Sequence, residues 1–298
     1  MTKYHPDLSR IPFMLARHGE SKRNASEMEQ GRGDEIEGLP PNGLTDMGQL
    51  QTESIHPALA AAGITVECVN SSPLLRARET AKTLVRTSRP QPLLAETPVS
   101  DLEEMSQKGW ETVHTREEVR TLRRQALTEA IRKLRAAGLA SELEGHVAWI
   151  APLGEGEPPL GAALRGISAL ERYRPKPREL IVSHAMLNKY MDAVATRVPS
   201  SGRLRLLEMI SDTSEPGKIA AINGLRALGL PAFQVADDWR NQQANGGVTE
   251  YTIDPITDLW IAGRRIEPPK SSDTAPFVEY QRGEDGLWER VTPDDTSV

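Results

Sequence analysis

The residues best suited to chemistry are Arg17, His18 and Gly19, which follow the apolar run from Ile11 to Ala16. Such a run predicts a buried strand, and the polar residues after it predict a turn at the end of that strand. An imidazole beside a guanidinium suits the handling of a phosphoryl group, and a glycine lets a ligand approach the backbone. Three residues alone are a weak motif, so the rest of the chain must supply the partners of His18.

Three later segments carry polar side chains of the right types. A strand is predicted at Ile64–Val69, and Ser72-Pro73 after it predict a helix N-cap with proline at the first helical position. This places Arg76 in the first turn of a helix that runs to about Val85. Two acidic residues, Glu103 and Glu104, lie in a predicted loop, and His184 follows a strand predicted at 179–183.

The elements that must position these residues alternate between strand and helix patterns. This alternation predicts an α/β fold with a mostly parallel central sheet flanked by helices on both faces. In such a sheet the ends of the parallel strands meet at one edge, where ligands bind. The further predicted elements are a helix from Thr45 to Ala62 that stops at Gly63, a helix at about Met186–Thr196, and a closing strand pair at Val248–Ile253 and Leu259–Ala262.

We interpret residues 1–298 as a single domain with added segments. A helical cap insertion is expected at about 106–178, with a charged helix from Thr115 to Ala137 and mostly loop structure over 139–162. The arginines of this helix indicate either a solvated face or a surface that contacts an acidic substrate. A second insertion at about 201–240 includes a helical piece at 211–229. The C-terminal tail at about 268–298 is polar, and Phe277, Tyr280 and Trp288 are expected to attach it to the body.

Composition limits the classes of function. The chain has 298 residues, 38% hydrophobic and 26% charged, with a net charge of −6 and no basic run, which argues against a nucleic-acid partner. The start has no apolar signal core and no stretch is long enough to span a bilayer, so we expect neither a membrane partner nor export. Cys68 is the only cysteine, which excludes an internal disulfide and fits a cytoplasmic location.

Taken together, these segments resemble the histidine phosphatase superfamily, in its phosphoglycerate-mutase-like branch. The similar stretches occur in the order of the family and span residues 11 to about 262. They are Arg17-His18-Gly19-Glu20-Ser21 with Asn24, Leu44-Thr45-Asp46-Met47-Gly48-Gln49, Ser72-Pro73-Leu74-Leu75-Arg76-Ala77 with Thr80-Ala81, Leu102-Glu103-Glu104 with Gly109-Trp110-Glu111, Val182-Ser183-His184, and weaker echoes at Gly156-Glu157 and Asn245-Gly246-Gly247-Val248-Thr249.

The resemblance implies a phosphohistidine mechanism in which His18 attacks phosphorus. Its imidazole must then be neutral, and the cations Arg17 and Arg76 would favour that state by lowering its pKa. They would also neutralise the phosphoryl oxygens, so that neither a metal nor a cofactor is needed. Glu104 would protonate the leaving oxygen and later deprotonate water, with Glu103 as the alternative. The remaining residues assigned to phosphate or substrate binding are His184, Asn24, Ser21 and Arg23.

The expected function is a metal-independent phosphomonoester hydrolase of the histidine acid type, acting on a small phosphorylated metabolite. The loop Ala25–Leu39 departs from the mutase pattern, and its five acids against one arginine suit a phosphoglycerate poorly. A mutase-type phosphotransferase remains the alternative, as does a silent phospholigand-binding protein on the same fold. A small-molecule phosphate monoester is the expected partner, and the added segments could also form a homo-oligomer surface. No P-loop, cysteine-phosphatase or aspartyl-phosphate motif is present.

Overall fold

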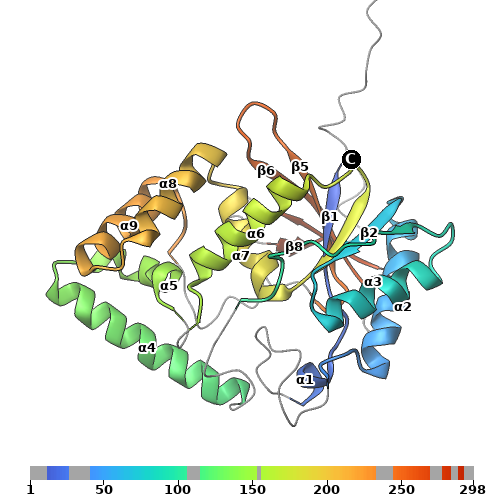
Figure 1. Ribbon diagram of the computed structural model, residues 1–298, viewed down its shortest axis with the longest axis horizontal. Coiled ribbons are helices and arrows are strands. Elements are labelled where there is room, and N and C mark those ends of the chain that lie inside the picture. Colours follow the sequence, from blue (N-terminus) through green and yellow to red (C-terminus); the bar gives the residue numbers. More distant parts are fainter. Residues whose placement is uncertain are drawn as a thin grey trace, which may run out of the picture.

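A mixed β-sheet forms the centre of the molecule (Figure 1). The computed structural model describes residues 12–26, 41–105, 115–152, 156–232, 244–268, 277–282 and 288–291. Within these ranges the sheet has eight strands in the order β3-β2-β4-β1-β5-β6-β7-β8. The strands are β1 (Phe13–Arg17), β2 (Cys68–Ser71), β3 (Leu93–Leu94), β4 (Glu179–Ser183), β5 (Val248–Ile253), β6 (Trp260–Glu267), β7 (Val278–Arg282) and β8 (Trp288–Arg290).

The three strands that carry the predicted site motifs, β1, β2 and β4, and their neighbour β3 pair in parallel, whereas β5 to β8 extend the sheet in antiparallel fashion. In β1, Leu15 pairs with Ile181 of β4 on one side and with Thr249 of β5 on the other. The C-terminal ends of β1, β2 and β4 therefore lie at the same edge. This confirms the predicted α/β fold with mostly parallel central strands.

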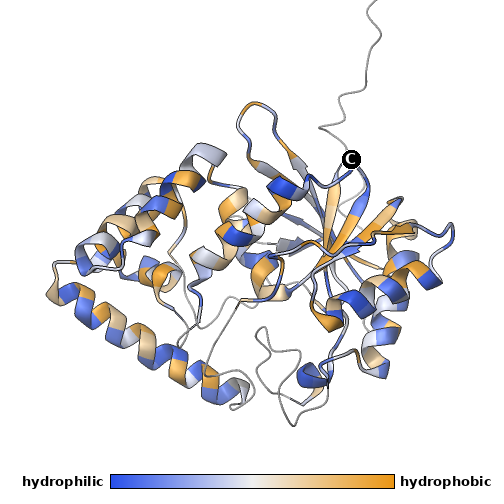
Figure 2. Ribbon diagram, viewed as in Figure 1, coloured by the Kyte–Doolittle hydropathy of each residue, from blue (hydrophilic) through white to orange (hydrophobic). Residues whose placement is uncertain are grey.

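Helices cover both faces of the sheet because the central strands are apolar on both sides. In β1, Met14 and Ala16 pack into the core beneath α2 (Asp46–Ala61) and α3 (Leu75–Thr87). Phe13 and Leu15 point to the opposite core, which α6 (Pro159–Tyr173) and α7 (Ala185–Ala195) help to form. This alternation is the two-residue period of a strand, and the central strands accordingly show mainly hydrophobic colours in Figure 2.

The added segments form a helical group beside the sheet (Figure 1). Its members are α4 (Arg116–Ala136), the 3₁₀-helix η2 (Ser141–His146), α5 (Val147–Ile150), α8 (Ser200–Ser211) and α9 (Glu215–Ala227). Helix α9 contacts α4, η2, α5 and α8, so two segments far apart in the sequence pack together. Hydrophilic residues occupy much of the length of α4 (Figure 2). None of the helices in the described ranges is both long and apolar enough to cross a membrane.

Several predicted boundaries are confirmed by capping contacts. Thr45 caps α2 by accepting a hydrogen bond from the backbone N–H of Gly48, and Thr115 caps α4 in the same way through Glu118. The helices end close to Gly63 and Gly138, both of which have positive φ. A glycine adopts that conformation without steric cost, which is why it marks helix ends so well.

Other predictions about local structure are wrong. Strand β2 runs over 68–71 rather than 64–69, because Ile64 and Val66 are buried without joining the ladder. The alternation of apolar residues over 64–69 therefore indicated which side chains are buried, but not which residues form hydrogen bonds with a neighbouring strand. Ser72 is not the N-cap of α3: the helix begins at Leu75, and the Ser72 hydroxyl is engaged with His184 instead.

The added segments also contain more regular structure than predicted. Residues 139–162 include η2, α5 and the start of α6 rather than mostly loop, and α8 precedes the helix predicted at 211–229. The C-terminal tail contributes β7 and β8 to the sheet. The Trp288 ring in β8 is buried and lies under the guanidinium of Arg265, 4.2 Å from its ring centre, so an aromatic contact does attach the tail.

Candidate active site

The end of β1 presents a buried imidazole in a defined tautomeric state. Nδ1 of His18 lies 2.7 Å from the carbonyl oxygen of Gly19, and Nε of Arg76 lies 3.3 Å from Nε2 of His18. A guanidinium can only donate, so Nε2 is the acceptor, and Nδ1 carries the proton that is donated to Gly19. The lone pair of Nε2 is therefore held on the side of Arg76.

The environment keeps this imidazole uncharged. Burial lowers the pKa of His18 well below its usual value, and the charges of Arg76 and Arg17 lower it further. The hydrogen bond to Gly19 acts in the opposite direction and is outweighed. Proximity to the two arginines agrees with the sequence prediction, whereas the larger effect of burial was not anticipated.

The turn after His18 depends on close backbone packing. A side chain at Gly19 would clash with the carbonyl oxygen of Gly48 in α2 and with the Thr52 hydroxyl. The backbone N–H of Gly19 also donates to Oγ1 of Thr80 in α3, at 3.1 Å. The glycine therefore lets the turn lie directly on two helices, which fixes the direction of the His18 ring.

Arg76 is fully buried in the first turn of α3. Such a position is electrostatically costly for a cation, because both desolvation and the helix dipole disfavour it. A guanidinium held there against an uncharged imidazole is typical of a site that binds an anion, and phosphoryl oxygens match its planar donors.

His184 lies across from His18, with ring centres 5.2 Å apart and planes at 60°. Oγ of Ser72 accepts a hydrogen bond from the backbone N–H of Leu74 at 3.3 Å and lies 2.8 Å from Nε2 of His184. The hydroxyl has a second lone pair, so it can either accept from or donate to Nε2; when it donates, the ring proton lies on Nδ1. Nδ1 has no hydrogen-bond partner among the described residues and is buried, so it can donate to a bound ligand.

The pKa of His184 is also lowered well below its usual value. Burial is the largest cause, followed by electrostatic interactions with Arg76, His18, Arg165 and Arg17 in that order. Both histidines of the site are therefore neutral; Gly19 and Arg76 fix the hydrogen-bonding roles of His18, and Ser72 occupies Nε2 of His184.

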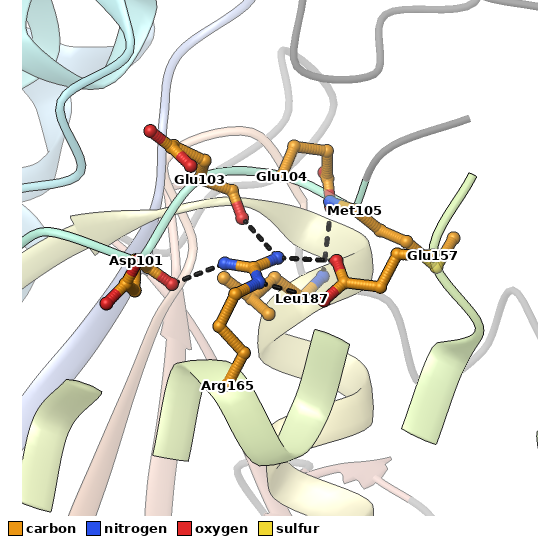
Figure 3. A network of polar contacts seen from close by, with 7 residues as sticks. All are labelled: Asp101, Glu103, Glu104, Met105, Glu157, Arg165 and Leu187. Atoms are coloured by element: carbon orange, nitrogen blue, oxygen red, sulfur yellow. Dashed lines mark hydrogen bonds and ion pairs between the residues drawn. The ribbon is translucent and has the colours of Figure 1, made fainter. Parts of the chain in front are cut away.

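Glu104 reaches the same place from a loop. The residue is 8% exposed, and Oε1 accepts hydrogen bonds from the backbone N–H of Met105 at 2.9 Å and of Leu187 at 3.2 Å. Leu187 lies in the first turn of α7, whose N-cap is His184. The Glu104 carboxylate thus lies at the N-terminus of the helix that His184 caps, while the Glu103 side chain points away from this network (Figure 3).

The remaining predicted site residues lie in α1 (Lys22–Ala25), directly after the His18 turn. Ser21 is the N-cap of α1, where its backbone N–H donates to Oδ1 of Asn24 at 3.1 Å and its hydroxyl accepts from the Asn24 N–H at 3.4 Å. The side chain of Arg23 is buried. The loop 27–39 and Gly109-Trp110-Glu111 lie outside the described residues.

Sequence reasoning missed two residues of the site. Ser72 was interpreted only as a helix cap, although its position after β2 was visible. Arg165 of α6 was not considered at all, although it lies eight residues after Glu157 of the Gly156-Glu157 echo. Figure 3 shows its guanidinium between Glu157 and the loop that carries Glu104.

Known proteins similar to this chain include phosphatases. A model of the histidine phosphatase superfamily (branch 1) matches residues 13–208. Similar solved structures include a mycobacterial glucosyl-3-phosphoglycerate phosphatase, with 16% identity over 85% of this chain and 97% of that one and a TM-score of 0.48. YhfR of Bacillus stearothermophilus has 20% identity over 89% and 98% of the two chains, at a TM-score of 0.49.

A phosphoserine phosphatase of Entamoeba histolytica, solved with phosphoserine, has 18% identity over 84% of this chain and 94% of that one, at a TM-score of 0.45. No curated protein sequence matches the chain at a significant level. The family match spans two thirds of the chain and includes His18, Arg76, Glu104 and His184. The chain therefore belongs to the histidine phosphatase superfamily, branch 1.

Proposed function

We propose that the protein is a phosphomonoester hydrolase that acts on a small phosphorylated metabolite through a covalent phosphohistidine at His18. The observation that carries this proposal is the state of His18: a buried, neutral imidazole whose Nδ1 is bonded to Gly19 and whose Nε2 faces the Arg76 guanidinium. A nucleophile must offer an unprotonated atom where the electrophile binds, and Nε2 meets that requirement.

In the first step, Nε2 of His18 attacks phosphorus and the bond from phosphorus to the ester oxygen breaks. Glu104 gives its proton to that oxygen, and the alcohol leaves. In the second step, the Glu104 carboxylate takes a proton from water, the water oxygen attacks phosphorus, and the P–N bond breaks to release phosphate. Dividing the transfer into two steps lowers each barrier.

The phosphoryl oxygens would be held by donors from separate elements. Arg17 and Arg76 supply positive charge, and the buried Nδ1–H of His184 supplies a neutral donor with no other partner in the described part of the chain. In Asn24 the side-chain oxygen serves the α1 cap, so its amide nitrogen would be the group that faces a phosphoryl oxygen. Fixed donors of this kind stabilise the charge that develops in the transition state.

Two other functions would use the same residues. A mutase must retain the phosphohistidine and return the phosphoryl group to a second hydroxyl, and a silent phospholigand-binding protein would bind the ester without turnover. The preference for hydrolysis over transfer rests on the sequence of the loop 25–39, of which residues 27–39 lie outside the described ranges. These alternatives are therefore outcomes of the test.

The test measures hydrolysis of an aryl phosphate by the purified protein in excess chelator, with His18→Ala as the matched variant. We expect activity that survives chelation and is lost in the variant, with a phosphohistidine at His18 detectable by mass spectrometry under alkaline conditions. Near-normal hydrolysis by His18→Ala would reject His18 as the nucleophile. Without activity above the variant, incubation with a set of phosphate esters separates a mutase or an enzyme of narrow specificity, which forms phosphohistidine at His18, from a silent protein that binds an ester without forming it.

A further inference from the structure

Arg165 connects helix α6 to the loop that carries Glu104 (Figure 3). Its Nε and Nη2 form a two-pronged ion pair with the Glu157 carboxylate, at 2.9 Å each. The same guanidinium donates from Nη1 to the carbonyl oxygen of Asp101 and from Nη2 to that of Glu103, at 3.2 Å. One side chain thus holds two carbonyls of a loop that is more than sixty residues away in the sequence.

The loop needs such contacts because its backbone provides little support of its own. Residues 102–105 belong to neither a helix nor a strand, and Asp101 has a φ of 65°, a conformation that is uncommon for a residue with a side chain. Leu102 is fully buried and fixes one point of the loop in the core. The direction of the next two residues then depends on what binds their backbone.

The contact with Glu103 bears directly on Glu104. The Glu103 carbonyl belongs to the peptide group that leads into Glu104, so the hydrogen bond from Arg165 limits rotation of that peptide. At its other end, Glu104 is held by the N–H of Leu187 in α7. Because α6 packs against α7, the two helices fix the backbone and the carboxylate of Glu104 relative to each other.

We propose that Arg165, itself oriented by Glu157, is a positioning residue that holds Glu104 in place for proton transfer to the leaving group. The inference rests on the proposed function, in which Glu104 is the general acid. An arginine suits the task because its planar fork can bind a carboxylate and two carbonyls at once, which a lysine cannot. The ion pair is largely shielded, with 18% of the Arg165 and 20% of the Glu157 side chain exposed, so solvent screens it weakly.

The experiment compares two esters that differ in their need for an acid: phenyl phosphate, whose leaving group must be protonated, and 2,4-dinitrophenyl phosphate, whose leaving group need not be. We expect Arg165→Met to lower kcat/KM for phenyl phosphate by about 10- to 100-fold, the scale on which a displacement of about 1 Å is felt. For the dinitrophenyl ester the loss should stay within about 3-fold, because attack by His18 does not need the acid. Competitive inhibition by inorganic phosphate should also be nearly unchanged.

Two further variants keep the proposal testable if Arg165→Met folds poorly. Glu157→Gln leaves the guanidinium in place but removes its charged partner, and it should show a smaller loss with the same preference for the activated ester. Arg165→Met made on a Glu104→Gln background should cause no additional loss with phenyl phosphate, since residues that act as a unit are not additive. Thermal unfolding of every variant monitors the fold.

Arg172→Gln is the matched control. Arg172 lies on the same helix and its Nη2 binds Oδ2 of Asp101 at 2.7 Å, but the two side chains are 63% and 48% exposed. An exposed pair of this kind contributes little, so both esters should be hydrolysed at nearly wild-type rates. Equal losses with both esters in Arg165→Met, or rates that match the control, would overturn the positioning role. Absence of His18-dependent hydrolysis of either ester by the wild type would instead overturn the proposed function and the inference with it.

Discussion

Oγ of Ser72 and Nε2 of His184 lie 2.8 Å apart, at the ends of the neighbouring parallel strands β2 and β4. The sheet itself sets this distance, because Ser71 pairs with Val182 and the N–H of Ser72 donates to the Val182 carbonyl at 2.8 Å. The same register places Ser72 level with Ser183, and the ring of His184, one residue further along the chain, contacts the Ser72 hydroxyl. Ser72 thereby occupies Nε2 of His184 and leaves Nδ1 as the nitrogen that can face a ligand.

Replacing Ser72 tests this relationship. In Ser72→Ala the His184 ring loses the hydroxyl that contacts Nε2, so this hydrogen bond no longer holds the orientation of the ring. We expect kcat/KM for an aryl phosphate to fall by about 5-fold and inhibition by inorganic phosphate to weaken, in line with the loss of one hydrogen bond of about 1 kcal/mol. Ser71→Ala is the control at the adjacent position in β2. Identical kinetics of the two variants would refute the role of Ser72.

A second prediction concerns the neighbouring residues Glu103 and Glu104. The carboxylate of Glu104 lies at the N-terminus of α7, whereas the side chain of Glu103 points away. Glu104→Gln should therefore lower kcat/KM for phenyl phosphate by about 100-fold or more, and much less for 2,4-dinitrophenyl phosphate, as expected for loss of a general acid. Glu103→Gln should be close to wild type with both esters. If Glu103→Gln shows the selective loss instead, the acid has been assigned to the wrong residue.

Arg76 should influence His18 through its charge. Its proximity lowers the pKa of His18, but burial is the larger cause. In Arg76→Met we expect the pKa of His18 to rise and yet to stay below its ordinary value of about 6.5. An NMR titration of the His18 ring would measure this, with the exposed Arg78→Met as the control. An unchanged pKa would show that the charge of the guanidinium does not affect the imidazole.

The same Arg76→Met variant should also lose activity. Hydrolysis of an aryl phosphate should fall by about 100-fold or more, because the phosphoryl oxygens lose a fixed cation.

The sequence was most informative where local chemistry determines structure. Thr45 and Thr115 as caps, Gly63 and Gly138 as helix ends, and the strand before His184 follow from contacts within a few residues of each other. The site motifs could also be grouped at one edge, because parallel strands align their C-terminal ends.

Features that depend on distant parts of the chain could not be predicted. The pairing of β2 with Leu93 and Glu179 moved that strand toward the C-terminus of the predicted range. Nothing in the sequence distinguishes Arg165 from an ordinary arginine on a helix. Its contacts with the loop follow only from the packing of α6 beside that loop. In the same way, Ser72 has the properties of a helix cap until His184 is placed against it.

The two buried histidines should also make the stability of the protein depend on pH. Because burial and nearby arginines lower the pKa values of His18 and His184 in the folded state, the unfolded state binds more protons once the pH falls below the unfolded value of about 6.5. Stability is therefore lost as the pH decreases from about 6.5 toward the lowered pKa of the folded state. When the pH is lowered from 7.5 to 5.5, each histidine should decrease the free energy of unfolding by up to about 1.4 kcal/mol.

Urea unfolding at these two pH values, in the wild type and in His18→Ala, isolates the contribution of His18. The variant starts from a different stability, because its site has lost an imidazole, so the comparison uses only the change with pH in each protein. Carboxylates contribute equally to both and cancel. The variant should lose about 1 kcal/mol less than the wild type over this range. An equal loss would mean that His18 takes up a proton in the folded protein as readily as in the unfolded chain, which contradicts the neutral nucleophile.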